Sequence, residues 1–367
     1  MYKKKVLINA IAAKSSGALS ILKDFINYIY NYTDPNIEYY LFTVVDDFVS
    51  MKGFHVVLLP RKGWLSRIQW DEGGLEKWCK KKSIIPDCII SLQNTSTKWA
   101  KDKIPQVVYY HQPLPLVNYK FNLLDKNEFL LFLYQKFYFF FVNRNNYNTT
   151  YIVQLPYIKD LLNKKLNRNN KNSIFVVTPN TPHVQLISKK SSNDKFTFLY
   201  PATPLRYKNH KIIIDALVRL VNINSPVLSN IRIIFTIDSL SQQIQNKIKE
   251  YNLSSVIRFI GKKPYHELLD IYAKVDAVLF PSQIESYGLP LIEAASFGLP
   301  IIASDLIYAH EVLPDYDNIL FIDPENEILW ADAISDYRNL NKTKPLIRNN
   351  SNSWGEVINI SLSLINK

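Results

Sequence analysis

Glu285, Gly288 and Glu293 are the residues of this chain whose types and spacing are best suited to chemistry. An apolar strand is expected to end at Phe280, the loop after it presents Glu285, and a helix begins near Gly288. Carboxylates accept hydrogen bonds from hydroxyl pairs such as those of sugars and ribose, and the first N–H groups of a helix suit a phosphate. Glycine lets the backbone approach a ligand closely because it has no Cβ. The segment predicts a site for a ligand with hydroxyl and phosphate groups, although each glutamate alone also fits an ordinary loop or helix-end charge.

A basic segment earlier in the chain, Tyr200–His210, also follows an expected strand, and an expected helix begins there at Lys208. A lysine at this place can neutralise a diphosphate as it becomes a leaving group, and Arg206 is a second candidate for that role. The alternative is a solvated basic loop, because long charged side chains are mostly exposed.

His111 is the candidate for proton or hydroxyl chemistry in the first half of the chain. It follows the apolar strand 106–110 and precedes a proline-broken loop, so it should emerge at the carboxyl edge of a sheet. Histidine can hydrogen-bond a sugar hydroxyl or move a proton near neutral pH, but neighbouring backbone can also satisfy it. Asn94 follows the expected strand 88–92, and Gly17 lies in the loop after the first strand.

The elements that position these residues alternate between short apolar runs and helical segments. Such alternation is typical of α/β architecture with parallel sheets, and 367 residues are too many for one ordinary core but comfortable for two. The composition shifts to Asn, Lys and Arg at 167–173, and a rigid proline-containing connector follows at 178–182. We therefore expect domains at 1–180 and 181–345 and a C-terminal helix within 346–367, which Ser353 can cap.

The chain is basic, with 44 Lys and Arg against 32 Asp and Glu and a formal net charge of +12. This balance suits nucleic acid, an anionic membrane face or phosphorylated substrates, but no zinc finger, basic zipper or RNA-recognition motif is recognisable. The two cysteines, Cys79 and Cys88, indicate neither a disulfide framework nor a zinc site, and they fit a reducing cytoplasm.

Two further segments point to a surface role. The most apolar run, 129–142, is too short to span a membrane. A core helix is its first interpretation and an interfacial anchor the alternative. The segment 61–65 combines charge with an aromatic ring, as membrane-surface or acceptor contacts do, although an exposed loop explains it equally well.

A set of motifs in the second half resembles the retaining glycosyltransferases of family 4. The motifs that carry the resemblance are Ile260-Gly261, Tyr272, Asp276, Pro281-Ser282, Glu285-x7-Glu293, Gly298-x-Pro300, Ala303-Ser304-Asp305 and Glu311-Val312. The resemblance implies the GT-B fold, in which two Rossmann-like domains face each other across a cleft and a C-terminal helix crosses back to the N-terminal domain. It is strong over most of the C-terminal half and looser in the N-terminal half.

The same resemblance implies a donor site. Glu285 would contact the donor sugar, Glu293 the ribose, and the backbone around Gly288 the diphosphate. Lys208 matches the family's lysine, whereas Pro201-Ala202 stands where members often have Gly-Arg. The residues implied for the donor are Arg206, Lys208, Glu285, Ser286, Tyr287, Gly288, Leu289 and Glu293.

On the acceptor side, the resemblance implies that His111 lines the donor sugar and the acceptor, so that His111, Lys208 and Glu285 form the catalytic group. Asn94 is expected beside the acceptor. The loop at Gly17 resembles the family's glycine loop near the reaction centre, although many members have two glycines there.

The resemblance therefore implies a retaining glycosyltransferase that needs no metal or cofactor. Its donor is expected to be a UDP- or GDP-sugar. Its acceptor is expected to be a glycan or lipid-linked oligosaccharide, because 91–94 and 110–113 resemble enzymes that build O-antigen, capsule or other surface polysaccharide. The protein is expected to be cytoplasmic, or peripheral at the cytoplasmic face of the inner membrane with contact to anionic lipid, and to have no nucleic-acid partner.

Two other classes of protein compete with this interpretation. One is a phosphorylase or epimerase on the same fold, which would need a different acceptor site around Gly17 and His111. The other is a catalytically degenerate GT-B binding subunit, or a basic membrane or nucleic-acid adaptor. The intact Glu285, Glu293 and Lys208 argue against degeneration.

Overall fold

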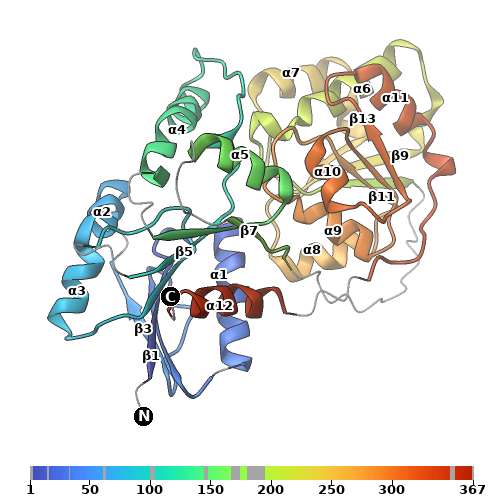
Figure 1. Cartoon of the computed structure of the whole chain (residues 1–367). Helices are drawn as coiled ribbons and strands as arrows, with labels where there is room; N and C mark the ends of the chain where they lie inside the picture. Colours follow the sequence, from blue (N-terminus) through green and yellow to red (C-terminus); the bar gives the residue numbers. More distant parts are fainter. Residues whose placement is uncertain are drawn as a thin grey trace. The chain divides into compact units, whose positions relative to one another are not determined.

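The chain divides into two compact units in the computed structural model (Figure 1). Unit 1 comprises Met1–Pro179 with Ser351–Lys367, and unit 2 comprises Asn180–Asn350. The structure describes residues 3–14, 16–32, 34–60, 63–99, 104–143, 148–166, 174–179, 195–347 and 352–365. The polar segment 167–173 and connector residues 180–182, on which the predicted domain boundary rested, lie outside these ranges.

Unit 1 contains a parallel sheet whose strand order is β3-β2-β1-β4-β5-β6-β7. The strands are β1 Lys4–Asn9, β2 Ile37–Thr43, β3 Phe54–Leu58, β4 Cys88–Ser91, β5 Gln106–Tyr110, β6 Thr149–Val153 and β7 Ile174–Val176. The helices are α1 Ser16–Asn31, α2 Trp64–Gln69, the π-helix η1 Trp70–Gly74, α3 Leu75–Lys81, the 3₁₀ turn η2 Leu114–Leu116, α4 Lys126–Asn143, α5 Pro156–Leu166 and α12 Ser353–Ser363. The central strands are almost wholly apolar because helices bury both of their faces.

The pleat of β1 divides the core of unit 1 into two layers, since successive side chains point to opposite faces. Val6 and Ile8 join the cluster that contains α1 and α12, including Phe25 and Trp354. Leu7 joins the cluster on the other face, which contains residues of α3. Both faces of the sheet are therefore covered, and its ligand-binding edge is the carboxyl end of the strands.

Unit 2 contains a second parallel sheet with the order β10-β9-β8-β11-β12-β13. Its strands are β8 Phe196–Tyr200, β9 Ile231–Phe235, β10 Ile257–Phe259, β11 Ala277–Phe280, β12 Ile301–Ser304 and β13 Ile319–Ile322. Its helices and 3₁₀ turns are η3 Arg206–Lys208, α6 His210–Asn222, η4 Pro226–Ser229, α7 Gln242–Glu250, η5 Leu253–Ser255, α8 Tyr265–Tyr272, α9 Leu289–Ser296, α10 Ile307–Val312, α11 Glu327–Ser335 and η6 Tyr337–Asn339. Both sheets reverse their strand order once, between β1 and β4 and between β8 and β11. Ligands of doubly wound sheets bind at such switch points.

Helix α12, the last element of the chain, packs on unit 1. The ring of Trp354 lies 5.0 Å from that of Phe25 and 5.1 Å from that of Tyr109, centroid to centroid. The indole Nε1 donates a hydrogen bond to Oδ2 of Asp24 at 2.6 Å. The predicted return of the C-terminal helix to the N-terminal domain is therefore confirmed.

The predicted cap of α12 is wrong by one residue. Asn352 is the N-cap, and its side-chain oxygen accepts a hydrogen bond from the N–H of Gly355 at 3.0 Å. Serine and asparagine both have cap chemistry, so the sequence alone did not separate Asn352 from Ser353.

Helix α4 is not the core helix that its apolar sequence suggests. Its buried residues are Gln135, Phe139 and Val142, while Phe137 and Phe140 are 62% and 64% exposed. Across the described parts of the chain, no helix combines the length and the apolar character that crossing a membrane requires.

Candidate active site

The switch point of unit 2 brings Lys208 and Glu285 together. Strands β8 and β11 are neighbours in the sheet, so the loops that leave their carboxyl ends meet. Nζ of Lys208 lies 2.7 Å from Oε1 of Glu285, and the two side chains are only 16% and 12% exposed. A cation and a carboxylate from distant parts of the chain therefore form one partly desolvated pair at the predicted site.

Lys208 belongs to the 3₁₀ turn η3, and not to the helix predicted to begin at this residue. Asn209 has a left-handed backbone with φ +57°, which separates η3 from α6. Nζ of Lys208 also lies 5.4 Å from the ring centroid of Tyr207. Arg206 begins η3 and is exposed, so the structure supplies a second positive charge near the pair without burying it.

Tyrosine hydroxyls and a backbone bond hold the two loops in place. The hydroxyl of Tyr200 donates to the carbonyl oxygen of Lys208, and the N–H of Gln283 donates to the carbonyl of Tyr207 at 2.8 Å. The hydroxyl of Tyr308 donates to the carbonyl of Ser282 at 2.6 Å. These bonds fix the lysine loop to the sheet and to the glutamate loop, which preorganises the charged pair.

Helix α9 begins directly after the glutamate loop. Its N-cap, Gly288, has φ +80°, a conformation that glycine adopts without strain. Pro290 occupies the first turn, where its missing N–H does no harm. Tyr287 and Gly288 are buried, while Ser286 and Leu289 are partly exposed. The predicted run from Ser286 to Leu289 thus forms the entry into a helix N-terminus, where an anion is favoured.

Glu293 lies inside α9 and is 5% exposed. Its Oε2 accepts a hydrogen bond from the hydroxyl of Tyr272 in α8 at 2.8 Å. Burial raises the pKa of this carboxyl to about 7, although hydrogen bonds from Tyr272 and Tyr265 oppose the rise. Near neutral pH the group is therefore poised between its charged and neutral forms.

In unit 1, the loops after β4 and β5 bring Asn94 and His111 together. Asn94 has φ +65°, and its Oδ1 accepts a hydrogen bond from the backbone N–H of His111 at 2.7 Å. Burial, and then the charge of Arg67, lower the pKa of His111 to about 4. Its buried Nδ1 finds no hydrogen-bond partner within the described residues. A neutral imidazole with a spare nitrogen can hydrogen-bond a hydroxyl group of a ligand.

Gly17 lies in the first turn of α1 and is exposed. Apart from its chain neighbours and the backbone of its own helix, no atom lies within 4 Å of the place where a Cβ would be, so packing against other elements does not require glycine here. The structure shows no contact that joins this residue to Asn94 or His111.

A partly buried arginine, Arg67, and a buried aspartate, Asp71, stand behind the loop of Asn94, and sequence reasoning missed both. Asp71 accepts hydrogen bonds from Asn9 at 3.2 Å, Gln93 at 2.7 Å and Thr95 at 3.1 Å. Burial raises the pKa of Asp71 to about 6, while the charge of Arg67 acts in the opposite direction. Asp71 thus ties the end of β1 to both residues that flank Asn94.

Arg67 reinforces the same loop from α2. Its Nη2 donates to the carbonyl oxygen of Gln93 at 2.7 Å, to Oγ1 of Thr95 at 3.3 Å and to the hydroxyl of Tyr138 in α4 at 3.2 Å. The only local signal for this network in the sequence is that Arg67 and Asp71 stand one helical turn apart in a segment that contains tryptophans. Their role depends on contacts with segments far away in the chain.

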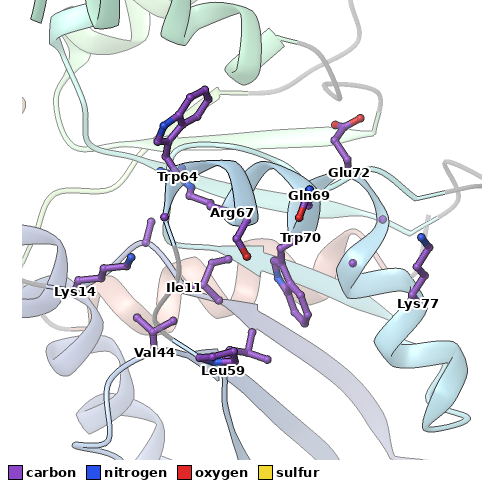
Figure 2. A pocket seen from close by; sticks show the side chains of 16 residues that line it. Ile11, Lys14, Val44, Leu59, Trp64, Arg67, Gln69, Trp70, Glu72 and Lys77 are labelled. Atoms are coloured by element: carbon purple, nitrogen blue, oxygen red, sulfur yellow. The ribbon is translucent and has the colours of Figure 1, made fainter. Parts of the chain in front are cut away.

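A pocket of about 870 Å³ opens beside this network (Figure 2). It lies at the carboxyl ends of β1, β2 and β3 and is walled by α2, η1 and α3. The lining includes the indoles of Trp64 and Trp70 and the cations Lys14, Arg67 and Lys77. Of the segment 61–65, Gly63 and Trp64 line the pocket, whereas 61 and 62 lie outside the described residues.

The π-helix η1 shapes this pocket. Gly73, inside η1, has φ +132° and lines the pocket, and only glycine adopts such a conformation readily. Single π-turns are frequent at functional sites. Aromatic faces with a few polar and charged groups are typical of small-molecule sites. Elsewhere in the described ranges, no three His, Cys, Asp or Glu side chains gather as a metal site requires.

The second half of the chain, which contains Lys208 and Glu285, matches a family of known proteins. Residues 185–354 match the family model described as Glycosyl transferases group 1. The chain is 25% identical over 213 residues to the O-antigen chain mannosyltransferase RfbU of Salmonella typhimurium, a match that covers 56% of this chain and 56% of RfbU. The matched part thus spans little more than half the length of that relative.

Solved structures show the same fold over nearly the whole chain. WaaG, a glycosyltransferase involved in lipopolysaccharide biosynthesis, has a TM-score of 0.66 at 11% identity, covering 97% of this chain and 99% of WaaG. HepE from Anabaena, solved in complex with UDP and glucose, has a TM-score of 0.63 at 15% identity, covering 99% of this chain and 97% of HepE. The predicted α/β fold of the GT-B class is confirmed.

Proposed function

Because residues 185–354 match the model of the Glycosyl transferases group 1 family, we propose that this protein transfers a sugar from a nucleotide-diphosphate sugar to a glycan or lipid-linked acceptor. The observation that carries the proposal is the Lys208–Glu285 pair at the switch point of unit 2, next to the N-terminus of α9. Cation, carboxylate and helix start together suit a ligand that has a diphosphate and sugar hydroxyls.

In this proposal unit 2 binds the donor. Lys208 and the N-terminus of α9 stabilise the negative charge that grows on the diphosphate as it leaves, and the exposed Arg206 adds to the positive field. Glu285 accepts hydrogen bonds from the sugar, and Glu293 accepts them from the ribose. The backbone from Ser286 to Leu289 borders the diphosphate. Lys208, Arg206 and the N-terminus of α9 provide positive charge from the protein itself, so the proposed reaction uses no metal ion or other cofactor.

The chemical step breaks the bond between the anomeric carbon and the diphosphate oxygen and forms a bond from that carbon to an acceptor hydroxyl oxygen. The hydroxyl proton passes to the departing diphosphate on the same face of the sugar, which gives retention. His111, neutral at pH 7 because of its lowered pKa, orients a sugar or acceptor hydroxyl by a hydrogen bond. Asn94 fixes the backbone of His111, and the exposed turn at Gly17 leaves room for the substrate.

The acceptor is proposed to enter the pocket of unit 1. Sugar rings pack their apolar faces on aromatic rings, and Trp64 presents an indole that is 69% exposed. The name of RfbU supports an O-antigen or similar surface polysaccharide as the product, and the HepE complex supports UDP as one candidate nucleotide. We place the reaction at the cytoplasmic face of the inner membrane, with no nucleic-acid partner.

A thermal-shift screen tests the donor site. The purified chain is heated with UDP-, GDP-, ADP- and dTDP-sugars, each with a divalent metal and with a chelator. A ligand that binds the native state raises the melting temperature by mass action, so we expect a shift with one nucleotide class that is indifferent to metal. No shift with any nucleotide would contradict a donor site in the free protein and favour a degenerate binding subunit.

A further inference from the structure

The two charged side chains of the proposed donor site bind each other. Nζ of Lys208 lies 2.7 Å from Oε1 of Glu285, and the side chains are only 16% and 12% exposed. In the pair Lys247–Asp215, between α7 and α6, the lysine is 36% exposed. A charge-assisted hydrogen bond in a partly desolvated place is stronger than one on the surface. A ligand that needs Lys208 must therefore compete with Glu285 for its ammonium group.

The backbones on both sides of this ion pair are held in place. The hydroxyl of Tyr200 donates to the carbonyl oxygen of Lys208, and the N–H of Gln283 donates to the carbonyl oxygen of Tyr207 at 2.8 Å. The ring centroid of Tyr207 lies 5.4 Å from Nζ of Lys208 and offers the ammonium a second favourable neighbour. Because the two loops are tied together, a change of partner involves the side chains of Lys208 and Glu285 and not a movement of the loops.

A nucleotide sugar and a nucleoside diphosphate differ in what they offer this pair. The nucleotide sugar brings phosphate oxygens for the ammonium of Lys208 and hydroxyl donors for the carboxylate of Glu285. The nucleoside diphosphate brings only the phosphate oxygens. The carboxylate then loses the ammonium, receives no sugar hydroxyl in exchange and stays beside a negatively charged diphosphate. Separating a partly buried ion pair without replacing both partners is costly.

We propose that the Lys208–Glu285 pair makes the donor site discriminate between a nucleotide sugar and the nucleoside diphosphate that remains after transfer. Glu285 competes with the diphosphate for Lys208, and the hydroxyls of the donor sugar relieve that competition. When the sugar leaves, the competition returns and favours release of the diphosphate. The inference rests on the proposed function for the identity of the ligand, and it adds a role in product release to the contact with the sugar.

The test is calorimetry of UDP and GDP, and of UDP-glucose and GDP-mannose, with the full chain. Glu285→Gln keeps the shape of the side chain but carries no charge, so Lys208 becomes available to the diphosphate. We expect the nucleoside diphosphate that the wild type binds to bind about tenfold more tightly to the variant. The nucleotide sugar should gain less, so the preference for it over the diphosphate should fall. Glu285→Ala removes the same carboxylate and should shift diphosphate binding in the same direction.

Asp215→Asn is the matched control. It also replaces a carboxylate by an amide, changes the net charge by the same amount and separates a carboxylate from two lysines, Lys211 and Lys247. These pairs lie on α6 and α7, away from the loops that carry Lys208 and Glu285. The control should bind both kinds of ligand as the wild type does. The melting temperature of each variant without ligand shows that it is folded.

A double-mutant cycle tests whether the effect passes through Lys208. Glu285→Gln should add much less diphosphate affinity in a Lys208→Met background than in the wild type, because the competition needs the ammonium. An equal gain in both backgrounds would make Glu285 a simple repulsive charge and overturn the proposal.

Unchanged or weaker diphosphate binding in Glu285→Gln and Glu285→Ala would also overturn the proposal. If the wild type transfers sugar while these variants gain no diphosphate affinity, the proposed function stands and the role of the ion pair in product release fails. If the wild type binds neither nucleotide sugars nor nucleoside diphosphates, the donor site itself fails and this inference fails with it.

Discussion

The Lys208–Glu285 pair joins two loops of unit 2 within a site that is largely shielded from water. Shielding strengthens the attraction between the charges, and it also makes the lysine ready to meet a diphosphate. We expect Lys208→Ala to lower the transfer rate by roughly 10²-fold or more, as the loss of one preorganised charge stabiliser does in other enzymes. The measurement is a steady-state transfer assay, together with the melting temperature of the unliganded protein.

Lys211→Ala is the matched control for that prediction. Lys211 is 68% exposed and pairs with Asp215 on the surface of α6, where ion pairs contribute little. The control should keep its activity and its melting temperature. If Lys208→Ala kept full activity and only melted earlier, Lys208 would be a structural residue.

Glu293 predicts a pH dependence of stability. Its ordinary pKa of 4.5 in the unfolded chain rises to about 7 in the folded one, so the folded state keeps a proton that the unfolded state releases. The free energy of unfolding should therefore fall as the pH rises from about 4.5 to about 7, by on the order of 3 kcal/mol. Glu293→Gln cannot ionise but still accepts from Tyr272, so it should lose this slope. Denaturant unfolding across that pH range measures it.

Nucleotide binding should depend on Glu293 in the opposite sense. The charged carboxylate is the better acceptor for ribose hydroxyls, so wild-type affinity should increase as the pH rises through about 7. Glu293→Gln should bind more weakly and without this rise, whereas Glu327→Gln, on the exposed start of α11, should behave as the wild type. Calorimetry that found equal donor affinity in the wild type and Glu293→Gln would rule out the ribose role.

At the level of elements, β1, η1 and the loop after β4 meet through the buried Asp71. Asp71→Asn leaves one acceptor oxygen where the carboxylate receives hydrogen bonds from Asn9, Gln93 and Thr95. We expect a loss of about 1–3 kcal/mol in the free energy of unfolding and a higher KM for the acceptor, because the loop that carries Asn94 loosens. The nucleotide thermal shift should not change, since the proposed donor site lies in unit 2. A changed nucleotide shift with an unchanged acceptor KM would contradict this role.

The elements around the proposed donor site could be predicted well, and those around the proposed acceptor site only in part. The site of Glu285 follows from a local pattern of apolar strand, loop, glycine and helix, and the order of the strands then brings Lys208 beside it. The network of Arg67 and Asp71 joins four distant segments of the chain, so no local pattern contains it. Helix α4 is apolar on every side, so its sequence has no period that tells the inner face from the outer one.

The whole molecule is built so that unit 1 uses both ends of the chain and unit 2 is continuous between them. Each unit has its own sheet and its own core, so we expect two transitions in scanning calorimetry. A nucleotide sugar should raise the melting temperature of the unit 2 transition alone.

Trp354→Ala should lower the melting temperature of the unit 1 transition by the equivalent of about 3–5 kcal/mol, because α12 loses the indole that packs on the rings of Phe25 and Tyr109. Asp24→Asn, which keeps an acceptor for the indole N–H, should lower it less. The contrary outcome is a single transition whose temperature is shifted both by the ligand and by Trp354→Ala. The two units would then unfold as one, and α12 would couple the proposed donor site to the stability of unit 1.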